Sequence, residues 1–177
     1  MKIISVFIVT LTISFSVPGQ IIQDTFLVDH YQTKNFDCAI FPSNYSTIHP
    51  PDKLSKRYFT PSRQEIDSAE NALVMQLDKQ DSHYSKHDLP LICKKLNEFR
   101  RQYFGYIDST GHKILFINSF WAPQEKRKKS RDSASSNHLK IWLQKKISVD
   151  DGGASYWNIK FDTASKILFA LKINGPG

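Results

Sequence analysis

The sequence lacks the short motifs that mark common catalytic and nucleotide-binding sites. Only 7 of its 177 residues are glycine, and these nowhere form a glycine-rich loop that binds phosphate groups. No serine stands in a Gly-x-Ser-x-Gly turn, where α/β-hydrolases hold their nucleophile. These absences weaken an enzymatic interpretation, although catalytic residues can also converge from distant positions in a chain.

Cysteine is scarce as well, with Cys38 and Cys93 as its 2 occurrences. No Cys-x-x-Cys pair is present, which excludes a redox or zinc motif of that spacing. In an oxidising compartment an even pair predicts a disulfide, which would close a loop of about 55 residues and add about 4 kcal/mol in the chain-entropy model. The alternative is two buried thiols, because the sequence does not show whether their Cβ atoms meet.

Metal-binding patterns are incomplete. His83 and His87 have the spacing of His-Glu-x-x-His, but the glutamate is missing and the segment falls in a polar loop. Asp150 and Asp151 precede two glycines without the further acidic positions of an EF-hand loop. We therefore expect surface histidines, a tight turn at 150–153 in which glycine permits a positive φ, and no metal or other cofactor.

A hydrophobic run at the N-terminus predicts a signal peptide over residues 1–19. Lys2 supplies the positive charge, and Ile3–Phe15 is apolar apart from Ser and Thr. Small residues permit cleavage after Ser16 or Gly19. A retained anchor is less favoured, because the run is shorter than the roughly 20 residues of a spanning helix. No cysteine follows the run, so a lipid-anchored lipoprotein is not supported.

The remaining chain has room for one domain with a sizeable core. Hydrophobic residues make up 40% of the sequence and aromatic residues 12%, which is typical of a folded protein rather than a disordered tail. Within residues 20–60, turn-forming Asn, Asp, Ser and Pro are frequent, so we expect an irregular N-terminal segment there. The folded domain is expected over residues 61–177.

Two amphipathic helices are expected at the start of this domain. Ser62 and Glu65 form a capping box, and apolar residues then recur at helical spacing through residues 62–79. A second helix should begin near Asp88, and its apolar face continues to Tyr103. A polar loop joins the two, so they should form a helical hairpin.

The apolar period then changes from 3.6 to 2, which predicts a meander of strands. Asp108 and Gly111 begin and end a turn of the type I form with a glycine bulge. The expected strands are 104–108, 112–121, 138–149, 155–161 and 166–173. The fold class is therefore α+β, with two helices packed on one face of a four- to five-stranded antiparallel meander sheet.

A basic run lies in the charged and serine-rich loop of residues 124–137. Its cations are Lys126, Arg127, Lys128, Lys129 and Arg131. They would favour an anionic partner such as lipid headgroups, acidic glycans or nucleic acid, in keeping with a net charge of +7 that falls by one when Lys2 leaves. No aromatic residue interleaves the cations, so a solvated loop is the plainer interpretation and nucleic acid is the least favoured partner.

Aromatic residues gather in the strand region and have two interpretations. They could line a ligand groove, but strands are enriched in aromatic residues for packing alone, so we expect core positions. The residues are Tyr103, Phe104, Tyr106, Trp121, Tyr156 and Trp157.

Three motifs occur in order along residues 60–177: Tyr-x-Gly-Tyr-Ile-Asp at 103–108, Asp-Gly-Gly at 151–153, and a closing Asn-Gly at 174–175. In this order they resemble a set of small exported proteins of Bacteroidota-type bacteria to which no activity is assigned. The resemblance implies a location in the bacterial envelope and brings no ligand or catalytic residue. The chain departs from the pattern in its basic loop and in the segment that carries Cys38.

The sequence therefore predicts an exported small binding or structural protein of the cell envelope, located in the periplasm or outside the cell. No membrane-spanning segment is expected after signal cleavage. One alternative is a hydrolase-type enzyme with a dispersed site that would use His83, His87, Asp150 or Asp151. Another is a secreted protease inhibitor, suggested only by the order of helices and strands.

Overall fold

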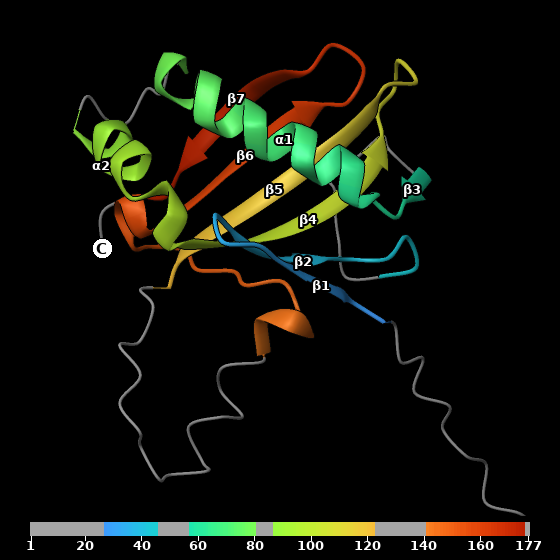
Figure 1. Cartoon of the computed structure of the whole chain (residues 1–177), viewed down its shortest axis with the longest axis horizontal. Helices are drawn as coiled ribbons and strands as arrows, with labels where there is room; N and C mark the ends of the chain where they lie inside the picture. The colour runs from blue at the N-terminus through green and yellow to red at the C-terminus, as the bar shows by residue number, and fades with distance from the viewer. Residues whose placement is uncertain (1–26, 46–56, 81–86, 123–140, 176–177) are drawn as a thin grey trace, which may run out of the picture.

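The computed structural model describes residues 27–45, 57–80, 87–122 and 141–175. Over these ranges the fold is α+β, with a seven-stranded mixed sheet and two α-helices (Figure 1). The helices are α1 (Arg63–Gln76) and α2 (Asp88–Lys94). The strands are β1 (Asp29–Gln32), β2 (Asp37–Ile40), β3 (Arg57–Phe59), β4 (Phe99–Ile107), β5 (Lys113–Trp121), β6 (Tyr156–Asp162) and β7 (Ile167–Ile173). The predicted signal peptide lies outside the described residues.

The strand order is β1-β2-β4-β5-β6-β7, and β3 pairs with the end of β4 that β2 leaves free. The pairing of β2 with β4 is parallel, and the other pairings are antiparallel. The α+β class is thus confirmed, but a four- to five-stranded, purely antiparallel meander is wrong. Residues 20–60, expected to be irregular, contribute β1, β2 and β3. These strands have only three or four residues, too few for a period of 2 to show in the sequence.

The capping box at the start of α1 is confirmed. The Ser62 hydroxyl accepts from the Glu65 backbone N–H at 3.3 Å, and the Glu65 carboxylate accepts from the Ser62 N–H at 2.8 Å. A 3-10 turn at Leu77–Lys79 follows the helix, so the predicted range of residues 62–79 is confirmed. The capping box satisfies two backbone donors that the first helical turn leaves open.

The second helix is shorter than expected. α2 ends at Lys94, a 3-10 turn follows at Leu96–Glu98, and Phe99 already belongs to β4. Phe99 and Tyr103 are four residues apart, a spacing that fits one face of a helix and also one face of a strand. Pairing with β2 on one side and β5 on the other selects the strand.

The strand predicted over residues 138–149 is also wrong in its described part. Residues 141–149 form a 3-10 turn at Ile141–Leu143 followed by a segment without regular secondary structure, which joins no strand of the sheet. The strands predicted at 112–121, 155–161 and 166–173 are confirmed as β5, β6 and β7. Gly111 has the positive φ of 92° that the predicted turn requires.

Both faces of the sheet are buried, but by different parts of the chain. On one face, α1 lies across the strands (Figure 1). Ile66, Leu73 and Ile92 of the two helices belong to the same core cluster as Ile117 and Trp157 of the sheet. The opposite face is covered by Phe41, Tyr45 and Trp142, which pack against Phe104 and Phe116. Within the described ranges, no helix has the length and apolar character needed to cross a membrane.

Candidate functional site

A cavity of about 860 Å³ opens between three elements on the helical face of the sheet, and we name it the α1 cavity. Its walls come from the β1–β2 turn at residues 33–36, from α1 and the 3-10 turn after it, and from the end of α2 through residue 97. Arg101 reaches it from β4. A concave site with a few convergent polar groups is the usual form of a small-molecule binding site.

Arg101 is the buried cation of this site, with 1% of its surface exposed. Its Nη2 donates to the Leu96 carbonyl at 2.6 Å and its Nη1 to the Phe99 carbonyl at 3.5 Å. The same Nη1 lies 3.4 Å from Glu70 Oε1. Arg101 Nε has no hydrogen-bond partner among the described residues. A buried charge needs both pairing and complete hydrogen bonding, so this side chain is incompletely satisfied.

Glu70 is the acidic neighbour of Arg101 and is itself buried, on the face of α1 that packs on the sheet. The Tyr103 hydroxyl donates to Glu70 Oε1 at 2.7 Å. Burial raises the pKa of Glu70, although the charge of Arg101 and the Tyr103 hydrogen bond act in the opposite direction. Burial also raises the pKa of Tyr103, so its hydroxyl keeps the proton it donates.

Arg101 belongs to a row of opposed residues on neighbouring strands. Cys38 of β2 lies opposite Arg101, Arg101 opposite Ser119 of β5, and Ser119 opposite Trp157 of β6. Ser119 Oγ and Trp157 Nε1 are also buried without a partner among the described residues. Among the described residues, the three buried side-chain atoms without a partner therefore belong to three adjacent residues of this row. Of these three residues, only Arg101 lines the α1 cavity.

Cys38 belongs to this row and Cys93 lines the α1 cavity, and both are free thiols in the structure. Cys38 is buried on β2 beneath α1, whereas Cys93 is half-buried at the end of α2, where it lines the α1 cavity. The disulfide expected from the sequence is thus not formed here, and pairing of the two stays a prediction. Burial raises the pKa of both thiols, which keeps them protonated and weakly nucleophilic.

The residues considered for a dispersed catalytic site are not assembled into one. His87 directly precedes α2, Asp150 and Asp151 are exposed before β6, and His83 lies outside the described residues. No cluster of three or more His, Cys, Asp or Glu side chains capable of holding a metal occurs in the described part of the chain. The basic residues Lys126, Arg127, Lys128, Lys129 and Arg131 also lie outside it, so their anionic partner stays a prediction.

The aromatic residues of the strands are mainly core residues. Tyr103, Phe104, Tyr106 and Trp157 are buried, while Trp121 is exposed. They therefore stabilise the two faces of the sheet by packing and do not form one groove.

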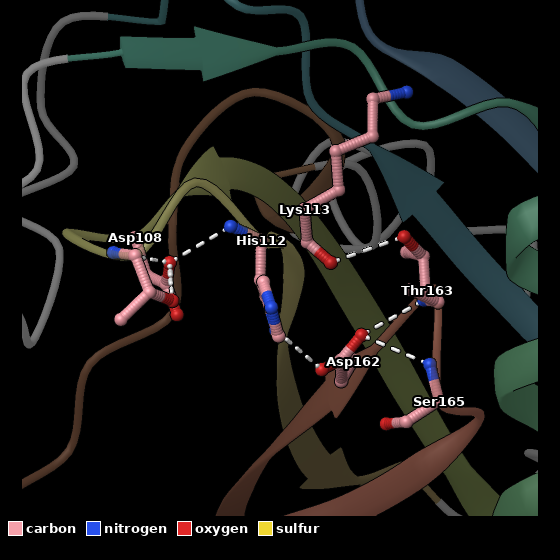
Figure 2. A network of polar contacts seen from close by, with 8 residues as sticks. Asp108, His112, Lys113, Asp162, Thr163 and Ser165 are labelled. Atoms are coloured by element: carbon pink, nitrogen blue, oxygen red, sulfur yellow. Dashed lines mark hydrogen bonds and ion pairs between the residues drawn. The ribbon is translucent and has the colours of Figure 1, made fainter.

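A second polar cluster joins the β4–β5 turn to the β6–β7 turn (Figure 2). One Asp108 oxygen accepts from the backbone N–H groups of Thr110 and His112, and His112 Nδ1 lies 3.0 Å from Asp162 Oδ2. Asp162 also accepts from Ala164 N–H. Most of these hydrogen bonds have a backbone N–H group of a turn as the donor, and the contact between His112 and Asp162 links the two turns. The cluster therefore has a structural role, as expected for a turn that sets strand register.

A third polar cluster lies on the opposite face of the sheet and holds residues 142–147. Gln102 Nε2 donates to the carbonyls of Trp142 and Lys145 at 2.7 and 2.8 Å. Gln102 Oε1 accepts from Asn118 Nδ2 at 2.9 Å and from Ile147 N–H at 2.8 Å. The side-chain amide of Gln102 thus has four partners, which is its full capacity.

A smaller cavity of about 420 Å³ lies beside this segment, between residues 146–150 and the adjoining ends of β6 and β7. Lys146 and Lys172 are among its lining residues, and burial lowers the pKa of Lys146. Among the described residues that line this smaller cavity, no charged side chain is fully buried, so we regard the α1 cavity, which has both Glu70 and Arg101, as the better candidate site.

Sequence reasoning missed both buried charged residues of the α1 cavity, Glu70 and Arg101. Glu70 stands four residues after Ile66 and three before Leu73, which places a carboxyl within the apolar stripe of α1. Arg101 lies between Phe99 and Tyr103 on the same inward face of β4. The sequence pattern, however, predicts a helix at these positions. In both cases the sequence does contain a clue, namely a charged residue at a position whose apolar neighbours predict a buried face.

The chain matches no protein-family model, no curated protein and no solved structure in these comparisons. The resemblance to exported Bacteroidota-type proteins therefore stays a prediction. The functional interpretation depends on the geometry of the α1 cavity.

Proposed function

We propose that this protein is a small binding protein of the cell envelope or exterior, and that its ligand occupies the α1 cavity. Export is supported by the predicted signal peptide over residues 1–19 and by the motif resemblance. Binding is supported by the cavity, which has the size and mixed lining of a small-molecule site.

Arg101 is the observation that carries this proposal. Arg101 lines the cavity with 1% of its surface exposed, and its Nε is buried without a partner among the described residues. A guanidinium is an expensive way to fill a core, since a charge loses several kcal/mol of hydration on burial. An apolar residue would pack there at no such cost. A cation at the cavity wall that attracts an acceptor or anionic group of a ligand would account for keeping a charge at this position.

A binding role is favoured over catalysis because the cavity offers no activated nucleophile among the described residues. Cys93 lines the cavity, but burial raises the pKa of its thiol, which lowers the fraction of reactive thiolate. Glu70 is a carboxyl with a raised pKa and therefore the group through which an acid–base activity would act. No contact among the described residues supports the hydrolase or protease-inhibitor alternatives.

Binding in the cavity can be tested by nitrogen-15 NMR titration with three probes of equal length: octanoate, 1-octanol and octylamine. We expect at least one to shift, saturably, the amide signals of residues that line the α1 cavity. Asn71→Trp would place a large ring at the exposed cavity wall and should abolish those shifts. Gln64→Trp is the matched control, because Gln64 is exposed on the same helix but does not line the cavity.

The proposal fails if none of the three probes shifts these signals, or if Asn71→Trp leaves the shifts unchanged. Shifts confined to residues 146–150 and the ends of β6 and β7 would move the binding site to the smaller cavity and also contradict it.

Export is tested separately by expressing the whole chain in a secreting bacterium and measuring the intact mass of the product. We expect loss of the first 16 or 19 residues. A mass lower by two hydrogen atoms, restored on reduction, would show that Cys38 and Cys93 pair after export. An unprocessed chain retained in the cytoplasm would contradict the envelope location.

A further inference from the structure

The smaller cavity beside residues 146–150 has a chemistry of its own, which goes beyond the function proposed for the α1 cavity. We propose that it is a second binding site, for a small hydroxylated anion such as a sugar acid or a sugar phosphate. Its volume of about 420 Å³ falls within the range of roughly 300 to 1,000 Å³ that is usual for small-molecule sites. Its lining is mostly polar, so a hydrophilic ligand fits it better than an amphiphilic one.

One side of this cavity is a row of opposed polar residues on three strands. Asn118 of β5 lies opposite Asn158 of β6, and Asn158 lies opposite Lys172 of β7. All three residues line the cavity. The row begins at Gln102 of β4, where the segment of residues 142–147 covers it. Farther along the row, Asn158 is half-buried and Lys172 is exposed, so this part of the row remains open to a ligand.

Two ammonium groups line the cavity without a carboxylate partner. They belong to Lys146 and Lys172, and neither forms an ion pair within the described ranges. Lys146 Nζ instead lies 5.0 Å from the centre of the Phe116 ring, which holds a cation without neutralising it. Burial lowers the pKa of Lys146, as expected for an ammonium with no anion beside it. An anionic group bound in the cavity would supply that missing charge.

The donors that would meet the anion are accessible. Lys146 and Asn158 are half-buried, and their side chains have no hydrogen-bond partner among the described residues. Over the same ranges, the polar atoms that are both unpartnered and shut off from solvent belong to other side chains. The Lys146 amine and the Asn158 amide can therefore be reached from the cavity, and both can donate to an anionic oxygen.

Two other amides of the lining offer acceptors. Asn118 Nδ2 donates twice within the third polar cluster, and Asn174 Nδ2 donates to the carbonyls of Val149 and Asp151. Both N–H groups of each amide are thus used, which leaves the two amide oxygens as acceptors. Hydroxyl groups of a ligand can donate to these oxygens, whereas a hydrocarbon chain cannot. The lining therefore favours a ligand that combines an anionic group with hydroxyls.

Asp150 reduces the positive charge of the cavity without cancelling it. It also lines the cavity, so two lysines and one aspartate leave a net charge of +1 among the lining residues. Asp150 is exposed, so its charge is screened by water and salt. Its carboxylate should still repel a bound anion, and removing this charge should strengthen anion binding.

The test titrates the whole protein with glucose 6-phosphate and gluconate, and with glucose and glucitol as their neutral counterparts, followed by nitrogen-15 NMR. We expect at least one of the two anions to shift, saturably, the amide signals of residues 146–150 and 172–175. That anion should bind at least about tenfold more tightly than its neutral counterpart, the difference that one charge-assisted hydrogen bond supplies. The comparison of the two anions shows whether the site prefers phosphate or carboxylate.

Variants of the lining separate this site from general attraction to a basic protein. Lys146→Met and Lys172→Met should each reduce the preference for the anion, and Lys146→Arg should retain it. Asp150→Asn should increase the affinity for the anion. Lys79→Met is the matched control, because it removes the same charge from an exposed residue that lines neither cavity, and it should leave the preference unchanged.

The inference is overturned if neither anion shifts these signals, or if the neutral compounds bind as tightly. It is also overturned if Lys79→Met weakens anion binding as much as Lys146→Met does, since binding would then follow net charge alone. Asn71→Trp, which blocks the α1 cavity, should leave anion binding unchanged. If Asn71→Trp abolishes it, the anion binds in the α1 cavity and the second site is wrong. Failure of either proposal is therefore distinguishable from failure of the other.

Discussion

Arg101 and Gln102 are neighbours on β4 that point to opposite faces of the sheet, and they differ in how completely their polar atoms are satisfied. Both are buried, with 1% and 0% of their surface exposed. Gln102 has four hydrogen-bond partners and holds the segment of residues 142–147 against the sheet. Arg101 lines the α1 cavity, and its Nε is buried without a partner among the described residues. A saturated buried group has a structural role, whereas an incompletely satisfied one beside a cavity calls for another explanation, and a ligand-binding role supplies one.

The largest effect on stability is expected at Gln102. Gln102→Leu would leave the carbonyls of Trp142 and Lys145, the Ile147 N–H and Asn118 Nδ2 without this partner. We expect the unfolding free energy to fall by about 3 kcal/mol, because several buried polar groups lose a bond at once. Urea denaturation measures the change, and probe binding in the α1 cavity should persist.

Gln64→Leu is the control for this substitution, since Gln64 is exposed and should change stability by less than about 0.5 kcal/mol. If Gln102→Leu costs no more than the control does, the face holding residues 142–147 is not organised by Gln102.

A smaller loss of unfolding free energy is expected when Arg101 is replaced. This substitution tests most directly whether Arg101 and Gln102 differ in their roles. Arg101→Met removes the bonds to the Leu96 and Phe99 carbonyls but replaces a desolvated cation with an apolar side chain of similar length. Glu70 can respond by holding its proton. We expect a loss of about 1 kcal/mol in urea denaturation. A loss as large as that of Gln102→Leu would make Arg101 a structural residue and remove the contrast.

Glu70 should make the stability of the protein depend on pH through the helical face of the sheet. Its pKa in the folded protein is raised above the usual 4.5, so folding favours the protonated form. The resulting stabilisation is present below pH 4.5 and is lost as pH rises through the folded pKa. In the Glu70→Gln variant, stability should not show this decline with rising pH. The wild-type protein should therefore become less stable relative to the variant as pH rises.

Denaturation curves from pH 5 to pH 8, a range of about three units, measure this difference. Asp108 and Asp162 do not contribute to this difference, because their pKa values are lowered. The stability that they add changes only as pH falls below about 4, outside the measured range. A difference between wild type and Glu70→Gln that stays constant across this range would contradict the expected decline in stability with rising pH.

Local rules predicted the parts of the fold that local interactions form. The capping box of α1 and the Asp108–Gly111 turn depend on residues a few positions apart, and both are present. The segment of residues 144–149 alternates like a strand, yet Gln102 binds its backbone from 45 positions away at Ile147. No local pattern records such a partner. For the same reason, the approach of Glu70 to Arg101 could not be predicted before the strand assignment of β4 was known.

The smallest effect is expected at the turns, where polar contacts are exposed. Desolvation acts to raise the pKa of Asp162, but hydrogen bonds from Ala164 and Ser165 N–H groups and the contact with His112 hold it below its usual range. Asp162→Asn keeps an oxygen for the two backbone donors and loses the charge that His112 faces. We therefore expect a loss of only about 0.5 kcal/mol, the usual size for an exposed ion pair. The loss should start to shrink below about pH 4 and disappear once pH has fallen through the lowered pKa of Asp162, where the wild-type carboxylate is itself protonated. A loss that persists there would mean that turn geometry rather than charge is at work.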